Sequence, residues 1–395
     1  MSDRAATEAL FNDMLQTYRK ECLPLYTKGW DKFSTAAKEK LLHMNNFFCG
    51  LHLLVSMAET ISASLKEFED QFFDGKHPGA PNVPGVGGFI NHSESRTVRL
   101  IRTCTKALAK GGDEKSGVHR HWKTFKRREN ITKRYLQVFR GNRFNIVFLL
   151  GGCVHFLHEK VFYFLDKVQG TTNRLLMAVH ADIQQPVFLA GCKVLGLLNK
   201  LVTTPLWRVT ESDGHIIDLC DQYTKLHNFF SECLEKDTTL FKFMKGEVSP
   251  FEDNLVNKDE VYDSLITETQ NDEIAMSMAR FTFTALKQLL GRVVKDFLPG
   301  GQYYDLKVNK EFLQQTLSVP KHNKLPERVF GYLDFLLKKR PNVRSITNEA
   351  QVMFTFNKTA KYMDSLTPEQ LHREIQEVMV KREGRIEERR EKRDL

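Results

Sequence analysis

Apolar side chains recur every three or four residues along most of this 395-residue chain, which is the spacing of helices that bury one face. In residues 5–30 the apolar positions that share a face are Leu10, Phe11, Met14, Leu15 and Tyr18. The same spacing is found in 47–65, 93–110, 144–166, 171–202, 211–246, 257–298, 326–340 and 343–363. The start of 47–65 also fits a short strand. The pattern therefore predicts a mainly α protein with one or two short strands near the N-terminus.

Glycine, proline and charge indicate where these helices end. Residues 77–88 (HPGAPNVPGVGG) are rich in proline and glycine, so they predict a loop that no regular element crosses. The steps at 111–112, 204–205 and 299–301 are further natural helix ends. Residues 369–395 alternate in charge sign, which is typical of a solvated helix or a disordered end.

Composition is that of a folded protein of a reducing compartment. Hydrophobic residues make up 41% and charged residues 27% of the chain. The N-terminus is polar, and the longest apolar runs, 144–156 and 187–202, contain glycine or polar breaks and fall short of the ~18 residues of a membrane span. The seven cysteines are odd in number and form no C-x-x-C pair, which favours reduced thiols. We therefore expect a nuclear or cytoplasmic location and no membrane partner.

The strongest charge feature lies between residues 120 and 143. Its cations are Arg120, Lys123, Lys126, Arg127, Arg128, Lys133, Arg134, Arg140 and Arg143, and Glu129 is its only acid. Trp122, Phe125, Tyr135 and Phe139 are interleaved with these cations and could either stack on bases or bury in the core. The net charge of +9 favours a nucleic-acid partner. A solvated helix face without a ligand fits the same residues equally well, so both interpretations stay open.

Other motifs for chemistry are weak. Residues 111–116 (GGDEKS) lack the glycine spacing of a phosphate-binding loop, so a plain turn is favoured. The sequence has no G-x-S-x-G motif, which leaves a hydrolase without an identifiable nucleophile. Cys49 and His52 stand three residues apart, as do His155 and His158, but a structural zinc site needs four ligands. Core packing is therefore favoured over metal binding for both pairs.

Four segments are spread over nearly the whole chain: 49–55 (CGLHLLV), 141–145 (GNRFN), 204–207 (TPLW) and 322–331 (HNKLPERVFG). They resemble motifs of the hAT-like transposases in their usual order. Residues 322–331 (HNKLPERVFG) resemble the C-terminal Glu-Arg-x-Phe signature of the family, and a basic turn follows at 338–342 (KKRPN). Residues 49–55 (CGLHLLV) resemble its C-x-x-H-x-L segment. Residues 141–145 (GNRFN) are similar to its T-R-W-N-S motif, with Phe in place of Trp. Residues 204–207 (TPLW) fall where the helical insertion of the family carries a tryptophan.

This resemblance implies a particular domain plan. The expected fold is mainly α, with a helical insertion domain and an incomplete RNase H-like α/β portion formed by the N- and C-terminal segments. The implied regions are 1–75 (partial RNase H-like segment), 76–92 (linker), 93–315 (insertion), 316–365 (RNase H-like helices with Glu327) and 366–395 (charged tail). The implied structural motif residues are Cys49, His52, Arg143, Trp207 and Arg328.

The chemistry of the family uses two Asp and one Glu to hold two Mg²⁺ ions, which activate the attacking oxygen and stabilise the leaving oxygen. Glu327 matches the third carboxylate, and Asp3 resembles the second. Arg328 would position Glu327 or pair with it. The first Asp has no counterpart, so the resemblance implies an N-terminally truncated, catalytically incompetent chain in which Asp3 and Glu327 are relics or partial metal ligands.

We therefore expect a transposase-derived DNA-binding protein that is inactive as this chain. Two alternatives stay open: a helical protein-interaction scaffold without nucleic-acid binding, and a Mg-dependent nuclease or strand transferase completed by another chain. Mg²⁺ is expected only in the last case. Self-association through the helical insertion is a further expectation.

Overall fold

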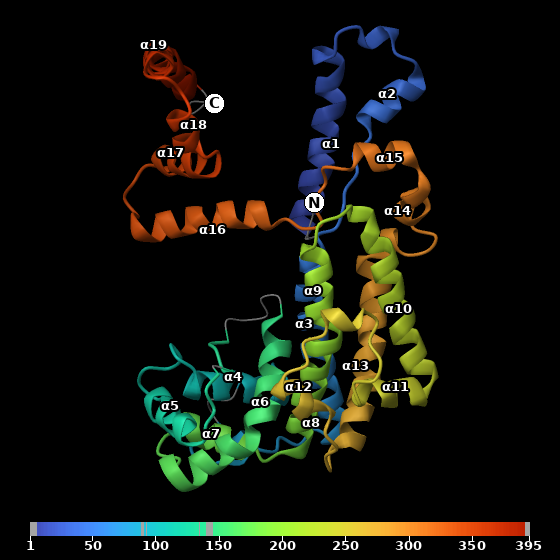
Figure 1. Cartoon of the computed structure of the whole chain (residues 1–395), viewed down its shortest axis with the longest axis vertical. Helices are drawn as coiled ribbons and strands as arrows, with labels where there is room; N and C mark the ends of the chain where they lie inside the picture. The colour runs from blue at the N-terminus through green and yellow to red at the C-terminus, as the bar shows by residue number, and fades with distance from the viewer. Residues whose placement is uncertain (1–5, 88–90, 92, 134, 140–144, 392–395) are drawn as a thin grey trace. The chain divides into compact units, whose positions relative to one another are not determined.

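The computed structural model describes residues 6–87, 91, 93–133, 135–139 and 145–391, and it divides into two compact units, Met1–His322 and Asn323–Leu395 (Figure 1). The helices of the first unit are α1 (Ala6–Tyr26), α2 (Thr35–Leu42), α3 (Gly50–Phe72), α4 (Arg96–Leu108), α5 (His119–Arg128), α6 (Ile146–Tyr163), α7 (Arg174–Asp182), α8 (Pro186–Leu198), α9 (Thr204–Glu211), α10 (Leu219–Glu235), α11 (Asp237–Met244), α12 (Glu260–Ile266), α13 (Asp272–Val293), α14 (Gln302–Asp305) and α15 (Lys310–Gln315). Those of the second are α16 (Lys324–Lys339), α17 (Ser345–Phe356), α18 (Thr359–Asp364) and α19 (Pro368–Glu391).

The prediction of a mainly α protein is confirmed, but the described residues contain no β-strand, so the expected RNase H-like α/β portion is not seen in them. The stretch 47–65, whose start also fitted a strand, is helical from Gly50 onward. The reason is that its apolar residues return to one buried face at helical spacing: Leu51, Leu54, Ala58, Ile61 and Leu65.

Helix α8 is the centre of the first unit. All its residues from Val187 to Leu198 are buried, as expected for a helix that is apolar on every side. Helices α4, α6 and α13 pack around it. At the crossing with α6 two glycines meet, and a Cβ added to Gly196 would lie only 2.7 Å from the Cα of Gly152. The absence of side chains at this point allows the two backbones to approach closely.

Two helical stretches, Ile146–Gln169 and Pro186–Glu211, are long and apolar enough to span a membrane by length and composition. The sequence predicts shorter runs here, but the helices continue through the polar breaks. Helix α6 runs on into the π-helix η4 (Phe164–Gln169), and α8 runs through the π-helix η5 (Asn199–Thr203) into α9. The most apolar window of the first stretch is 56% buried inside the protein, and that of the second stretch is 89% buried. Such burial is typical of core helices.

Buried ionic contacts fasten α3 and the Pro/Gly-rich segment to α4 and α7. Glu69 of α3 accepts hydrogen bonds from the amide and the hydroxyl of Thr97, at 2.9 and 2.7 Å, and so caps α4 from a different helix. Asp182 of α7 accepts two hydrogen bonds from Arg99 and one from the amide of Ala80, each at 2.8 Å. Burial raises the pKa of both carboxyl groups above their ordinary values. The described part of the expected linker is therefore attached to the core.

The second unit has few buried residues. Helix α16 packs on α17, and α17 packs on α18. The buried side chains among its described residues are Leu336, Asn348 and Val352, whereas Phe330 and Phe335 of α16 are 66% and 50% exposed. The expected helix pair corresponds to α16 and α17–α18, and the charged tail forms α19.

Candidate nucleic-acid interface

Helix α5 carries its aromatic and cationic residues on different sides. Trp122 and Phe125 are buried, and their ring centroids lie 5.4 Å apart. Both rings contact Phe164 of η4, at centroid distances of 5.2 and 5.1 Å. Since these two rings are part of the hydrophobic core, they do not form a platform on which bases could stack.

Four cations of α5 are exposed, Arg120, Lys123, Arg127 and Arg128, and we call them the α5 cation strip. The first three lie on the side opposite to Trp122 and Phe125, and Arg128 lies at the edge of that side. Residues 120, 123 and 127 follow i, i+3, i+7 spacing and so run along one face for about 10 Å. Within the described part of the chain, none of the four takes part in an ion pair. The strip therefore presents positive charge that no described carboxylate neutralises.

The remaining cations of this stretch are engaged differently. Lys126 is half-buried and donates a hydrogen bond to the carbonyl of Lys133 at 3.0 Å. Lys133 forms an ion pair with Glu260 at 2.9 Å; the contact raises the pKa of Lys133 and lowers the pKa of Glu260 to about 2. Glu129, the one acid of the stretch, pairs with Lys160. Arg134, Arg140 and Arg143 lie outside the described residues.

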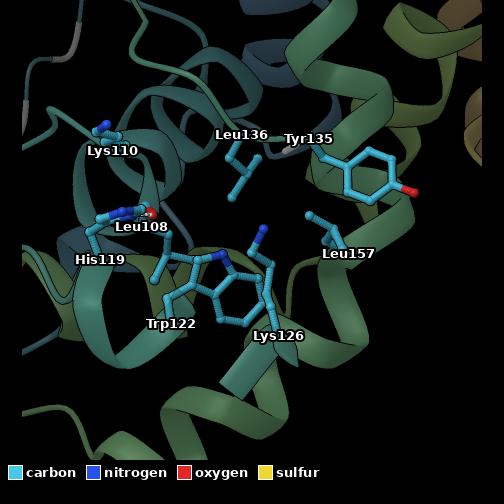
Figure 2. Close-up of a pocket in the computed structure, with 8 residues that line it drawn as sticks. All are labelled: Leu108, Lys110, His119, Trp122, Lys126, Tyr135, Leu136 and Leu157. Atoms are coloured by element: carbon cyan, nitrogen blue, oxygen red, sulfur yellow. Dashed lines mark hydrogen bonds between the residues drawn. The ribbon is translucent and has the colours of Figure 1, made fainter. Parts of the chain in front are cut away.

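A small pocket opens beside α5. Its lining residues are Leu108, Lys110, His119, Trp122, Lys126, Tyr135, Leu136 and Leu157 (Figure 2). A ring nitrogen of His119 lies 3.0 Å from the carbonyl oxygen of Leu108, and the hydroxyl of Tyr135 donates to Glu260. Because these polar groups already have partners within the protein, the α5 cation strip is the better candidate for a contact surface.

The loop 111–117 between α4 and α5 is a turn, as the sequence pattern favours. Asp113 accepts hydrogen bonds from the amides of Lys115 and Ser116, at 2.9 and 2.7 Å, and these contacts hold the pKa of its carboxyl group below the ordinary value. The amides of Gly112 and Gly117 donate to the carbonyls of Ala109 and Asp113. The amides of Gly112, Lys115, Ser116 and Gly117 are therefore used internally and are not available as a cradle for a phosphate.

Of the two expected catalytic carboxylates, Glu327 alone lies within the described ranges. Glu327 and Arg328 are exposed in the first turns of α16, and Asp3 lies outside the described residues. Among the described side chains, no group of three or more His, Cys, Asp or Glu is placed to hold a metal ion. Because Asp3 lies outside the described residues, the two-metal site that the resemblance implies stays a prediction.

One residue from each of two motif segments, Asn145 and Thr204, meets its counterpart beside η5. Asn145, the last residue of the 141–145 segment, donates from Nδ2 to Asn199 Oδ1 at 2.7 Å and to Thr204 Oγ1 at 2.9 Å. The hydroxyl of Thr203 donates back to Asn145. Since Thr204 opens α9, the Asn145 side chain ties the start of α6 to the junction between η5 and α9.

The other motif and metal-candidate residues lie in or against the core. Cys49 is buried at the start of α3, and His52 and Trp207 are half-buried. His155 is buried in α6, and burial lowers its pKa to about 3, so the ring is neutral at pH 7. His158 places Nδ1 2.5 Å from the carbonyl oxygen of His155. These surroundings agree with core packing, which the sequence favours for both pairs.

The sequence does not predict the buried lysines of α8 and η5 as anchors. Lys193 is 1% exposed, and its ammonium lies 2.8 Å from the carbonyl of Thr267 and 2.5 Å from Asp272. Lys200 is 5% exposed and lies 2.7 and 2.8 Å from the two carboxylate oxygens of Asp259. The sequence feature that could have indicated their burial is their position inside the apolar run 187–202. Together they hold both ends of α12.

Comparison of the chain with protein-family models, with curated proteins and with solved structures found no match. The feature with the clearest chemical consequence is the α5 cation strip.

Proposed function

We propose that this chain binds DNA through the α5 cation strip. The observation that carries the proposal is the set of four exposed cations on one helix, without carboxylate partners among the described residues. Phosphates of one B-DNA strand recur about every 3.4 Å along the helix axis. A strip of about 10 Å therefore matches two or three phosphates of one strand.

Burial of Trp122 and Phe125 supports a particular mode of contact. Since these rings face Phe164 inside the protein, α5 offers cations to the backbone and no ring to the bases. Contacts to phosphate position a protein on DNA but carry no sequence information directly. The proposed binding is therefore sensitive to salt and independent of base sequence.

The resemblance of residues 322–331 and 141–145 to hAT-like transposases supports DNA as the polyanion. We include a transposon origin in the proposal for that reason. Strand cleavage is not included, because Glu327 is the only matched carboxylate among the described residues.

The test is a titration of a fluorescent DNA duplex with the full chain across a salt series. The double variant Arg127→Glu, Arg128→Glu should weaken binding at least about tenfold, and the slope of log affinity against log salt should fall by roughly two. Unchanged affinity and slope would overturn the proposal.

A matched control separates the strip from net charge. Lys225 of α10 and Lys242 of α11 are exposed, so their double replacement by Glu changes the charge of the chain by the same amount. This control should retain most of the affinity. If it weakens binding as much as the α5 variant, the charge of the whole chain explains the interaction and the strip does not.

A further inference from the structure

Helix α5 carries a pair of neighbouring basic side chains at each of two points along its length. The second pair is Arg127 and Arg128, and the first pair is Arg120 and His121; all four side chains are exposed. Seven residues make almost two complete turns of an α-helix, so the two pairs face the same way and lie about 10 Å apart along the axis. His121 therefore has, at the first end of the helix, the position that Arg128 has at the second.

A contact with η4 orients the ring of His121. Its Nδ1 lies 2.6 Å from Oε1 of Gln169, the last residue of η4. Because an amide oxygen can only accept a hydrogen bond, Nδ1 is the donor and keeps its proton whether the ring is neutral or charged. No described residue bonds to Nε2 of this exposed side chain. Nε2 is therefore the atom that gains a proton when the ring becomes cationic, and it is open to a ligand.

The charged groups on the elements that pack against α5 already have partners. Helix α5 packs on α4 and η4. In η4, Asp166 pairs with Lys167 at 2.9 Å. In α4 the ion pairs are Arg96 with Asp70, Arg99 with Asp182, Arg102 with Glu94 and Lys106 with Asp113. The α5 cation strip therefore supplies the unpaired positive charge beside His121, and a polyanion bound to the strip would favour the charged form of the ring.

The other histidine of α5 is placed differently. His119 is half-buried and lines the pocket beside α5 together with Lys110 and Lys126 (Figure 2). One of its ring nitrogens lies 3.0 Å from the carbonyl oxygen of Leu108. Since His119 turns into this pocket, His121 is the histidine of α5 that can meet a phosphate.

We infer that His121, protonated at Nε2, is a fifth cation that binds a DNA phosphate beside the α5 cation strip. The inference rests on the proposed function, because the ring needs DNA on the strip as its anion. Histidine is the side chain whose charge changes between pH 5 and pH 8. DNA binding then takes up a proton from solvent at Nε2, so the affinity rises as the pH falls through this range.

The test titrates a fluorescent DNA duplex with the full chain at pH 8 and at pH 6. The variant His121→Gln keeps a polar side chain but cannot become a cation, so at pH 8 it should bind like the wild type. At pH 6 its affinity should be about three- to tenfold lower than that of the wild type, and its salt slope should be lower by roughly one. The variant His121→Lys should bind more tightly than the wild type at pH 8, because a lysine is already charged there.

The control variant His372→Gln removes an exposed histidine of α19 and so matches the change in net charge. It should keep the pH dependence of the wild type. The inference is overturned if His121→Gln binds as tightly as the wild type at pH 6, or if both glutamine variants lose the same affinity. The proposed function stands in either case if binding at pH 8 is lost in Arg127→Glu, Arg128→Glu. Absence of binding at both pH values overturns the proposed function and this inference with it.

A second measurement follows the proton itself. Calorimetric titrations in two buffers with different enthalpies of ionisation give the number of protons that the complex takes up when it forms. Within the range from pH 6 to pH 7, the wild type should take up more of a proton than His121→Gln does. Equal uptake by the two proteins would show that another group is protonated and would overturn the assignment to His121.

Discussion

Arg99 of α4 and Asp182 of α7 form a two-point ion pair in the core, with Nε and Nη2 each 2.8 Å from a carboxylate oxygen. Arg99 is 2% exposed and Asp182 0%. The pair joins α4 to α7. It also holds the Pro/Gly-rich segment, because the amide of Ala80 donates a hydrogen bond to the same carboxylate.

Removal of one partner should therefore be costly. We expect Arg99→Met to lower the free energy of unfolding by about 3–5 kcal/mol, since Asp182 would be left as a buried charge without its cation. Arg102→Met is the matched control, because the ion pair of Arg102 with Glu94 is partly exposed and should contribute about 1 kcal/mol or less. Urea unfolding measures both. Equal losses in the two variants would contradict a special contribution of the buried pair.

His155 should make stability depend on pH. Burial lowers its pKa to about 3 from an unfolded value of 6.5, and His158 and Lys193 lower it further while Asp272 opposes them. Between these two pKa values the unfolded chain binds one more proton than the folded chain. The contribution of neutral His155 to the free energy of unfolding is therefore complete above pH 6.5 and is lost as the pH falls toward 3. When the pH is lowered from 7 to 5, the free energy of unfolding should fall by about 2 kcal/mol less in His155→Leu than in the wild type. Equal losses of stability in His155→Leu and in the wild type would contradict this prediction.

The helices could be predicted from apolar spacing, but the breaks between them could not. Residues 257–298 read as one helical stretch, yet α12 ends at Ile266 and α13 begins at Asp272. The ammonium of Lys193 binds the carbonyl of Thr267 and the carboxylate of Asp272 at this break. Lys193 lies 74 residues from Thr267, so a local pattern cannot show that it stabilises the helix ends.

The cations of the candidate site could likewise be predicted from the sequence, but their ion pairs could not. The sequence shows the cations of 120–143, but it cannot show which of them are already paired. Glu260, 127 residues after Lys133, neutralises that cation, whereas Arg127 has no such partner among the described residues. The apolar spacing of α1 likewise predicts a helix correctly, while the direction in which that face points depends on tertiary contacts such as that of Arg19 with Leu41.

Two helical glycines should respond in opposite directions to the same substitution. In Gly196→Ala the new Cβ would lie 2.6 Å from a methyl group of Leu265 and 2.7 Å from the Cα of Gly152, so we expect a loss of about 1–3 kcal/mol from overpacking. In Gly291→Ala nothing lies within 4 Å of the new Cβ, and α13 should gain about 0.5–1 kcal/mol. Chemical denaturation measures both. A gain in Gly196→Ala would show that the α6–α8 crossing is looser than described.

Glu260 should limit DNA binding, because it neutralises Lys133 beside the α5 cation strip. Glu260→Gln keeps an acceptor for the hydroxyl of Tyr135 but frees the cation, so affinity should rise and the salt slope should steepen by about one. The pKa of Glu260 is about 2, so it stays ionised from pH 5 to pH 8 and should cause no change in affinity over that range. The control Glu247→Gln removes one exposed charge on the loop after α11. If both variants tighten binding equally in the duplex titration, net charge explains the effect; if Glu260→Gln changes nothing, Lys133 does not contact DNA.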